Sequence, residues 1–238
     1  MYVIEVNPRS SRTVPFISKS SGHSLADIAT RVMLGQSLKE QGYTSVYPEE
    51  KKKWYVKAPA FSFSKLNGID AYLSPEMKST GEAIGYDASL TRALYKALQS
   101  SGMNLSNYGT LLATIADAEK EEALPLIRRF YNLGFNIEAT EGTAKFLKEH
   151  GIRTRVRRKL GEDGTGSEEI LESIRRGYVS YVINTSDMSS ATNSVLDGYY
   201  IRHCAVENGV PLFTSLDTVR VLLDVLEEMT LTISTIDS

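Results

Sequence analysis

Cysteine, histidine and tryptophan are scarce in this chain of 238 residues, and their scarcity excludes several classes of protein. Cys204 is the single cysteine, so no disulfide can form within the chain, and a reducing cytoplasm is the expected location. A structural zinc site needs about four cysteine or histidine ligands. The three histidines, His23, His150 and His203, are far apart in sequence. We therefore expect neither an internal disulfide nor a structural zinc site.

Long hydrophobic runs and an excess of one charge are also missing. No apolar run is long enough to span a membrane, and Glu5, Arg9 and Arg12 interrupt any signal peptide. The net charge of −2 provides no global basic field for nucleic acid. The basic run at 153–159 lacks interleaved aromatic residues, so we interpret it as a solvated edge strand with one or two residues turned to a phosphate. Neither nucleic acid nor a membrane is an expected partner.

What the sequence does contain, from Tyr108 onward, is a regular alternation of apolar strands and amphipathic helices. Five strands are expected, at 111–115, 135–140, 153–158, 181–183 and 211–214. Strands that alternate with helices predict an α/β domain of three layers, αβα, with a five-stranded parallel sheet covered on both faces. Ligands of such sheets bind beyond the carboxyl ends of the strands.

A change of composition divides the chain near residue 102. Residues 100–107 are rich in Ser, Gly and Asn, which favours a boundary between domains at 1–102 and 103–238. The first domain is expected to be of α+β type, with helices near 25–33 and 90–98. The apolar stripe of the first of these helices is expected to lie in the core.

The stretch Phe135 to Lys145, FNIEATEGTAK, predicts a strand that stops at a threonine, turns tightly and opens a helix. Thr140, Gly142 and Thr143 supply two hydroxyls and a permissive backbone where the helix begins. Helix N-termini carry unpaired N–H groups and a partial positive charge, so this turn suits a phosphate. The alternative is that Thr140 only caps the helix and Gly142 only relieves the turn.

The expected strand ends of the second domain bring hydroxyls, amides and lysines to one edge of the sheet. Such groups suit an anionic, polyhydroxylated ligand, and neither Asp187 nor Asp197 is paired with a histidine in sequence. The set therefore indicates a binding site more than a reaction centre. Its members are Thr114, Lys120, Thr140, Thr143, Lys159, Asn184, Thr185 and Ser186.

The first residues of the chain carry a second candidate site. Glu5 and Asn7 are two residues apart on a predicted strand, so their oxygen-bearing side chains share one face, as Mg²⁺ ligands would. Arg9 and Arg12 follow, and guanidinium groups match phosphate geometry. The alternative is a strand end with solvated charges.

Three segments resemble the large subunit of carbamoyl phosphate synthase. EVNPRSSRTVPF at 5–16, RVMLGQSLKEQG at 31–42 and PEMKSTGE at 75–82 resemble the end of its second ATP-grasp unit and the sequence immediately downstream. ATEGT at 139–143 and INTS at 183–186 are similar to its C-terminal regulatory domain, which is methylglyoxal-synthase-like. The chain is far shorter than that subunit, so we expect a C-terminal fragment.

The resemblance implies a role for each matching residue. Glu5 and Asn7 correspond to Mg²⁺ ligands (or Mn²⁺ ligands) at an ATP site, and Arg9 and Arg12 correspond to phosphate-side catalytic arginines. The family is an ATP-dependent ligase that makes carbamoyl phosphate from bicarbonate, glutamine-derived ammonia and ATP, for pyrimidine and arginine biosynthesis. Its partner is a glutaminase small subunit. The fragment alone is expected to be catalytically silent, because the upstream ATP-grasp segments are absent from it.

In the regulatory domain, the resemblance implies a nucleotide effector such as UMP, IMP or phosphoribosyl pyrophosphate, with no cofactor of its own. The implied contacts are Lys120, Thr140, Thr143, Lys159, Asn184 and Ser186, where the family has a threonine at the last position. Two alternatives remain open. One is a lyase of the methylglyoxal synthase type acting on dihydroxyacetone phosphate, and the other is an assembly module that associates with itself.

Overall fold

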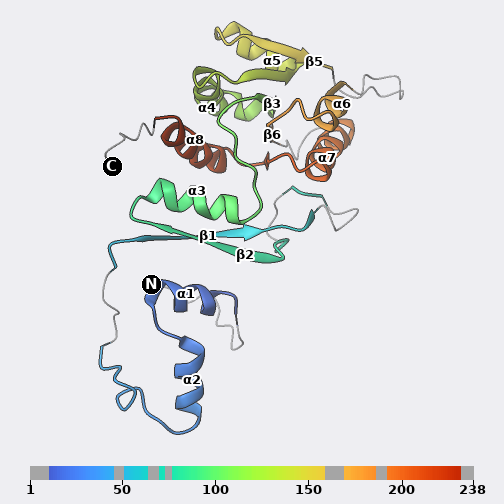
Figure 1. Cartoon of the computed structure of the whole chain (residues 1–238). Coiled ribbons are helices and arrows are strands. Elements are labelled where there is room, and N and C mark those ends of the chain that lie inside the picture. Colours follow the sequence, from blue (N-terminus) through green and yellow to red (C-terminus); the bar gives the residue numbers. More distant parts are fainter. Residues whose placement is uncertain are drawn as a thin grey trace. The chain divides into compact units, whose positions relative to one another are not determined.

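A computed structural model describes residues 11–45, 51–63, 70–72, 77–158, 169–185 and 192–231, except for the side chains of 192–196 and 230–231. The chain divides into two compact units, of which one comprises Met1–Pro59 and Gly81–Ser101 and the other Ala60–Thr80 and Gly102–Ser238. Figure 1 shows the course of the chain. The segment Ala60–Thr80 groups with the second unit, although the sequence pattern placed it in the first domain.

The first unit contains a two-stranded sheet covered by a helix. Its helix α3 begins after Ser89, whose hydroxyl accepts a hydrogen bond from the backbone N–H of Arg92. Gly85 of the sheet allows α3 to approach closely, because a Cβ there would collide with the backbone of Ala93 and Ala97. The elements are α1 (Thr13–Ser21), α2 (Leu25–Met33), β1 (Trp54–Ala60), β2 (Gly81–Asp87) and α3 (Leu90–Ser100).

One strand of this unit was not foreseen, and one expectation for it is wrong. No strand was expected at Gly81–Asp87, which forms β2. The apolar stripe of α2 is not core, because α2 has no buried residue and the side chains of Val32 and Met33 are exposed. A helical stripe predicts which face can be buried, but burial also needs a neighbouring surface, which periodicity does not supply.

The second unit is built on a parallel sheet of five strands in the order β5-β4-β3-β6-β7. Its elements are β3 (Thr110–Thr114), the 3-10 helix η2 (Asp117–Glu119), α4 (Lys120–Asn132), β4 (Asn136–Thr140), α5 (Glu141–Glu149), β5 (Thr154–Arg157), α6 (Glu169–Arg175), β6 (Tyr181–Asn184), α7 (Thr192–Glu207), β7 (Leu212–Phe213) and α8 (Leu216–Leu231).

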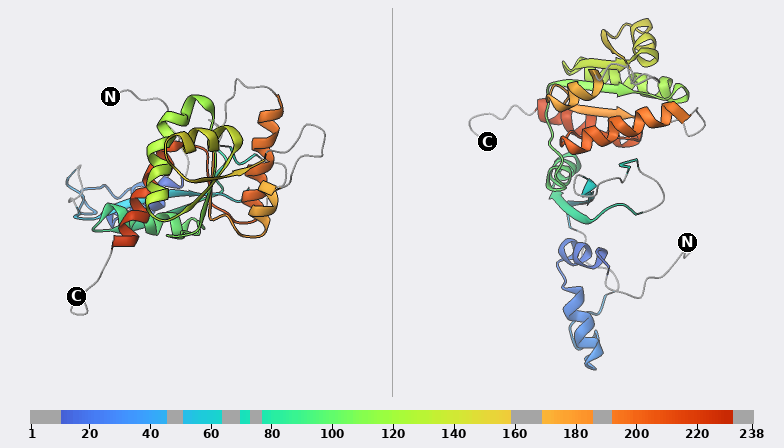
Figure 2. Two further views of the ribbon diagram at one scale, coloured as in Figure 1. Left: turned by 90° about the horizontal axis from the view of Figure 1, so that it is seen from above. Right: turned by 90° about the vertical axis from the view of Figure 1, so that its right-hand side faces the viewer.

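Alternate side chains of the central strand β3 enter two different cores. Leu111 and Ala113 pack with residues of α4, α5 and α8, whereas Leu112 packs with residues of α6 and α7. Helices therefore cover both faces of the sheet, and Figure 2 shows the sheet between them. The predicted three-layer αβα architecture with a five-stranded parallel sheet is confirmed.

The strand order creates a topological switch point beside β3. From β3 the chain passes to β4 on one side, and β6 pairs with β3 on the other side. In doubly wound sheets, the crevice at the carboxyl ends of the strands at such a point is the usual ligand site. Thr114 and Asn184 are register partners at this edge.

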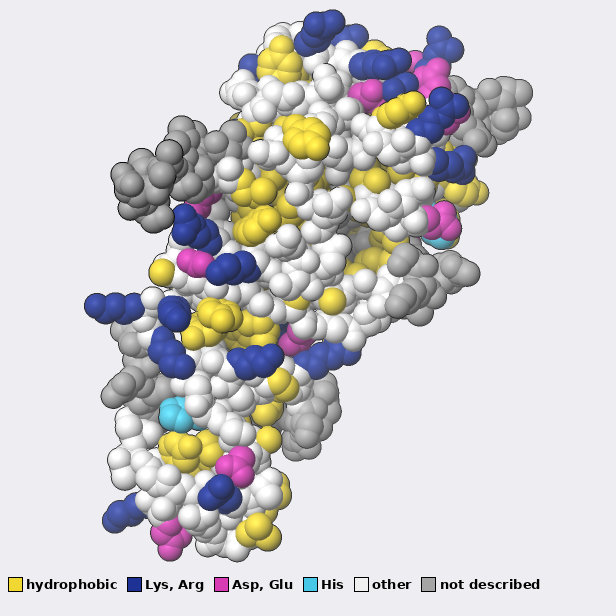
Figure 3. All heavy atoms as spheres, viewed as in Figure 1, with side chains coloured by type: hydrophobic (Ala, Val, Ile, Leu, Met, Phe, Trp, Pro, Cys, Tyr) yellow, Lys and Arg dark blue, Asp and Glu magenta, His cyan; other side chains and the backbone are white. Residues whose placement is uncertain are grey.

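The surface of the described residues carries charges of both signs. On the face drawn in Figure 3, basic side chains are scattered and several lie beside acidic ones. Ion pairs among the described residues join Lys96 to Asp87 and Arg176 to Glu172. Within the described segments, no helix combines the length and the apolar character needed to cross a bilayer.

Candidate functional site

The structure places the described members of the predicted effector set at the carboxyl edge of the sheet. Thr114, Thr140 and Asn184 end β3, β4 and β6, and Thr185 follows β6 directly. Lys120 is the first residue of α4, and Thr143 lies in the first turn of α5. Lys159 and Ser186 lie outside the described residues.

Most of the predicted metal-binding and catalytic residues of the first unit are not among the residues that the structure describes. Glu5, Asn7 and Arg9 are not among the described residues, so their roles stay predictions. Arg12 is described, at the N-cap position of α1, and its side chain is exposed. Its catalytic role is untested as well.

Hydrogen bonds tie the ends of β3 and β6 together. The backbone N–H of Thr185 donates to the carbonyl of Thr114 (3.0 Å), and the N–H of Ala116 donates to Oγ1 of Thr185 (2.8 Å). The side-chain amide Nδ2 of Asn184 donates to Oγ1 of Thr114 (2.5 Å). These bonds hold the loop after β3 against the loop after β6.

The turn between β4 and α5 is fastened to the same loop. The backbone N–H of Ile115 donates to Oγ1 of Thr143 (3.1 Å), and the hydroxyl of Thr140 lies 3.5 Å from that of Thr143. Thr140 occupies the N-cap position of α5, but its side chain makes no capping hydrogen bond. The alternative that Thr140 caps the helix is therefore confirmed for its position but not for a side-chain hydrogen bond. Glu141 and Gly142, in the exposed first turn, follow it.

Lys120 lies next to this first turn. A Cβ built on Gly142 would lie 3.4 Å from Nζ of Lys120, so the absence of a side chain there lets the ammonium group approach the start of α5. Lys120 is only 15% exposed and pairs with Asp117 at 2.5 Å, whereas the Asp117 side chain is 90% exposed. An ion pair with so exposed a partner is weak and can be exchanged for another anion.

The buried hydroxyl and amide groups at the strand ends hold the surrounding loops together through hydrogen bonds within the protein. Thr114, Thr140, Thr143, Asn184 and Thr185 are all buried, and each has a hydrogen-bond partner within the protein. Glu141 and Gly142 in the first turn of α5 are exposed, and the largely buried ammonium group of Lys120 lies beside them. A helix N-terminus together with an ammonium group favours an anion, above all a phosphate.

Sequence reasoning missed three polar features of this unit. The first is Glu138 on β4, which is buried and binds Arg157 through two hydrogen bonds of 2.7 Å each. These bonds raise the pKa of the Arg157 guanidinium. Arg157 was expected on a solvated edge strand, yet its side chain is only 12% exposed. The sequence offered one signal of this pair. Glu138 is a charged residue at an inward position of a buried strand, and a buried charge needs an oppositely charged or hydrogen-bonding partner.

The second missed feature is Glu119 and the third is Arg202. Oε2 of Glu119 is buried without a hydrogen-bond partner, so it offers an acceptor to a donor group of a ligand. Arg202 on α7 is buried and contacts Asn184. No local sequence signal identified either residue.

Within the described residues, no cluster of His, Cys, Asp and Glu suited to a metal ion occurs.

The match to a known protein family lies in the second unit. The sequence model of the family described as "MGS-like domain" matches residues 122–214, which include Thr140, Thr143 and Asn184 but not Lys120. Among solved structures, methylglyoxal synthase from Elizabethkingia anophelis NUHP1 is similar over 50% of this chain and 79% of that chain, with 20% sequence identity and a TM-score of 0.39. Domains of this type occur in methylglyoxal synthases and as allosteric domains of carbamoyl phosphate synthases. Residues 122–214 are thus an MGS-like domain.

Proposed function

We propose that the second unit binds a phosphorylated metabolite as a regulatory effector and does not transform it. The observation that supports this most is the approach of the Lys120 ammonium group to Gly142 at the exposed start of α5. Lys120 begins α4, which follows β3 and η2, and Gly142 lies in the first turn of α5, which follows β4, so both lie at the carboxyl edge of the sheet. A hydrogen bond to a charged partner at such a site contributes about 1.5–3 kcal/mol.

In this proposal, the second unit acts as the effector domain of a protein of the carbamoyl phosphate synthase type. The effector would be a nucleotide such as UMP or IMP, or phosphoribosyl pyrophosphate. Binding to one of two conformations of the intact enzyme would then change its affinity for ATP. The sequence resemblance supports this assignment, and the MGS-like domain is compatible with it.

The same proposal assigns the first unit to the end of an ATP-grasp synthetase domain. Glu5 and Asn7 would bind Mg²⁺, and Arg9 and Arg12 would face the phosphates of ATP. The glutaminase small subunit would be the partner of the intact enzyme. These roles depend on the sequence resemblance alone, and the chain by itself is proposed to have no ligase activity.

A lyase of the methylglyoxal synthase type is the second candidate. It needs a carboxylate base close to the bound phosphate. Asp117 is a described carboxylate that contacts Lys120, so it would be the base in that reaction. His150 and His203 do not favour it, because they lie at the end of α5 and within α7.

Isothermal titration calorimetry with UMP, IMP and phosphoribosyl pyrophosphate tests the regulatory proposal. We expect at least one of them to bind. We expect Lys120→Gln to lower the affinity for that ligand by about tenfold or more, because one charged phosphate contact is lost. Lys148→Gln is the matched control, because Lys148 is an exposed lysine near the other end of α5.

Two results would count against the proposal. One is a folded chain that binds none of the three ligands. The other is release of methylglyoxal from dihydroxyacetone phosphate, which would instead favour the lyase. In that case Asp117→Asn should abolish the activity.

A further inference from the structure

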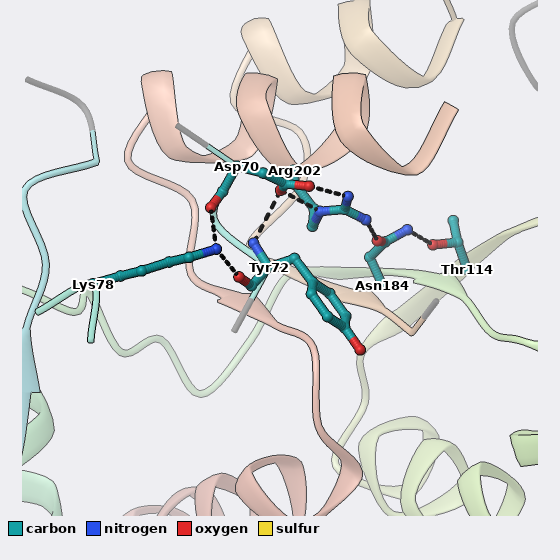
Figure 4. Close-up of polar contacts among 6 residues, drawn as sticks. All are labelled: Asp70, Tyr72, Lys78, Thr114, Asn184 and Arg202. Carbon is teal, nitrogen blue, oxygen red and sulfur yellow. Dashed lines mark hydrogen bonds and ion pairs between the residues drawn. The ribbon is translucent and has the colours of Figure 1, made fainter. Parts of the chain in front are cut away.

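Helix α7 carries a guanidinium group that is almost completely buried. Arg202 has an exposed fraction of 3%. A charge in a protein interior is costly unless it is paired and its donors are all used. Arg202 donates from Nε to Oδ1 of Asp70 (2.7 Å), from Nη2 to Oδ2 of Asp70 (2.5 Å) and from Nη1 to Oδ1 of Asn184 (2.7 Å). Figure 4 shows this arrangement.

Asp70 comes from a segment far from α7 in sequence. It lies in Ala60–Thr80, between β1 and β2 along the chain and 132 residues before Arg202. The N–H of Tyr72 donates to Oδ1 of Asp70 (2.9 Å), and Nζ of Lys78 donates to the carbonyls of Asp70 (3.1 Å) and Tyr72 (2.6 Å). The Arg202 guanidinium also lies 5.5 Å from the centre of the Tyr72 ring. Asp70, Tyr72 and Lys78 are thus joined by hydrogen bonds, and Asp70 and Tyr72 contact Arg202; we call these three residues the clip.

The charge of Arg202 fixes the orientation of the Asn184 side-chain amide. A guanidinium group can only donate, so Asn184 must turn Oδ1 toward Arg202 and Nδ2 toward Thr114. Oγ1 of Thr114 accepts that bond and lies 3.4 Å from the carbonyl of Ile183. Without Arg202 the Asn184 amide could turn over, and its oxygen would then face the Thr114 hydroxyl.

A glycine on α7 makes room for this arrangement. A Cβ at Gly198 would lie 2.8 Å from Nη1 of Arg202 and 3.5 Å from Oδ1 of Asn184. Gly198 is one turn before Arg202 on the same helix, so the guanidinium passes over it to reach Asn184. A residue that helices disfavour therefore stands where a side chain would obstruct this contact.

We propose that Asp70 and Arg202 are a positioning pair, which holds Asn184 and Thr114 in the orientation that the strand-end site requires and thereby couples ligand binding to the clip. The ligand part of this inference rests on the proposed binding of a phosphorylated metabolite. Coupling between two sites is reciprocal. If the clip favours the ligand-competent site, then the ligand must stabilise the clip by the same factor.

Two variants with the same chemical change test the pair. Asp70→Asn removes the charge that faces Arg202, and Glu227→Gln removes a carboxylate that binds Arg129 between α4 and α8, away from the strand ends. We expect Asp70→Asn to weaken binding of UMP or phosphoribosyl pyrophosphate by about 10-fold, within the range of roughly 5- to 150-fold typical of coupled sites. Glu227→Gln should leave the affinity unchanged while lowering stability.

Hydrogen exchange followed by mass spectrometry supplies the reciprocal measurement. In the unsubstituted chain, the bound ligand should slow exchange in the peptide that contains residues 70–72, and this protection should be lost in Asp70→Asn. Equal affinities of Asp70→Asn and Glu227→Gln, or no protection of this peptide by a ligand that does bind, would overturn the coupling.

A measurement without ligand separates this inference from the proposed function. The N–H groups of Ala116 and Thr185 are bonded within the strand-end loops, so Asp70→Asn should speed their exchange while Glu227→Gln should not. If neither UMP nor phosphoribosyl pyrophosphate binds but exchange speeds up, the proposed function fails and the positioning pair stands. If exchange at Ala116 and Thr185 is the same in both variants, the positioning pair is refuted.

Discussion

At the scale of single residues, the strand-end threonines illustrate how one side chain can serve the backbone or a ligand. The hydroxyl of Thr143 was predicted to contact an effector. In the structure it accepts a hydrogen bond from the N–H of Ile115, 28 residues earlier in the chain, and it is 2% exposed. A threonine hydroxyl can both donate and accept, so its residue type does not reveal which partner it has.

Replacing Thr143 by valine should therefore destabilise the second unit. Valine keeps the shape of threonine but leaves the buried N–H of Ile115 without an acceptor, which costs about 1–3 kcal/mol. Urea unfolding followed by circular dichroism measures the change. Thr143→Ser, which retains the hydroxyl, is the control and should lose less stability. Equal losses in the two variants would show that the hydroxyl contributes nothing.

At the scale of secondary-structure elements, α7 shows a conflict between local preference and tertiary contacts. A glycine inside a helix is less favourable than alanine by about 0.5–1 kcal/mol, because the unfolded glycine is more flexible. Gly198 nevertheless lies within α7, under the Arg202 guanidinium. A methyl group at this position would lie 2.8 Å from Nη1 of Arg202, so the tertiary contact favours glycine although the helix does not.

Gly198→Ala should accordingly lower the melting temperature, against the direction that helix propensity predicts. The new methyl group would lie 2.8 Å from Nη1 of Arg202, so the guanidinium would have to shift and its hydrogen bonds to Asp70 and Asn184 would weaken. In an Arg202→Met background the obstruction is removed, so the same Gly198→Ala change should become neutral or stabilising. Calorimetry on the four proteins of this cycle measures the coupling. Additive effects would contradict the account.

At the scale of the whole molecule, carboxylates held by arginines make stability depend on pH. Burial by itself would raise the pKa of Asp70, but hydrogen bonds from Arg202 and Tyr72, with the charges of Arg202 and Lys78, outweigh it and lower the pKa below 3.8. A hydrogen bond from Arg129 lowers the pKa of Glu227 below 4.5. Both groups bind a proton less readily in the folded chain than in the unfolded chain.

The second unit should therefore lose stability in acid. A carboxyl with a lowered folded-state pKa contributes its full stabilisation above the unfolded-state value, and the contribution disappears as the pH falls below that value. We expect the urea midpoint to fall between about pH 5 and pH 3. The double variant Asp70→Asn with Glu227→Gln should be less stable near neutral pH and should show a flatter pH dependence.

Circular dichroism at several pH values checks this expectation. Trp54 is the single tryptophan and lies on β1 in the first unit, so its fluorescence reports separately on that unit. An acid transition that is equally steep in the double variant would show that other groups control it.

The sequence by itself determined the layered α/β fold of the second unit. The alternation of buried strands such as 181–184 with amphipathic helices is a local pattern, and local patterns depend on neighbouring residues that the sequence displays directly. The same pattern predicted that Thr114 and Asn184 would meet at one edge, because parallel strands end together. The effector roles of these residues stay predictions.

Only the tertiary structure decided which polar groups pair. The bonds of Arg202 to Asp70 and of Arg157 to Glu138 join residues 132 and 19 positions apart, and no periodicity encodes such distances. The exposed stripe of α2 and the position of Ala60–Thr80 in the second unit were likewise decided by long-range packing. A pattern in sequence states what a segment can bury or donate, whereas the partner is chosen by which other segments the folded chain brings within reach.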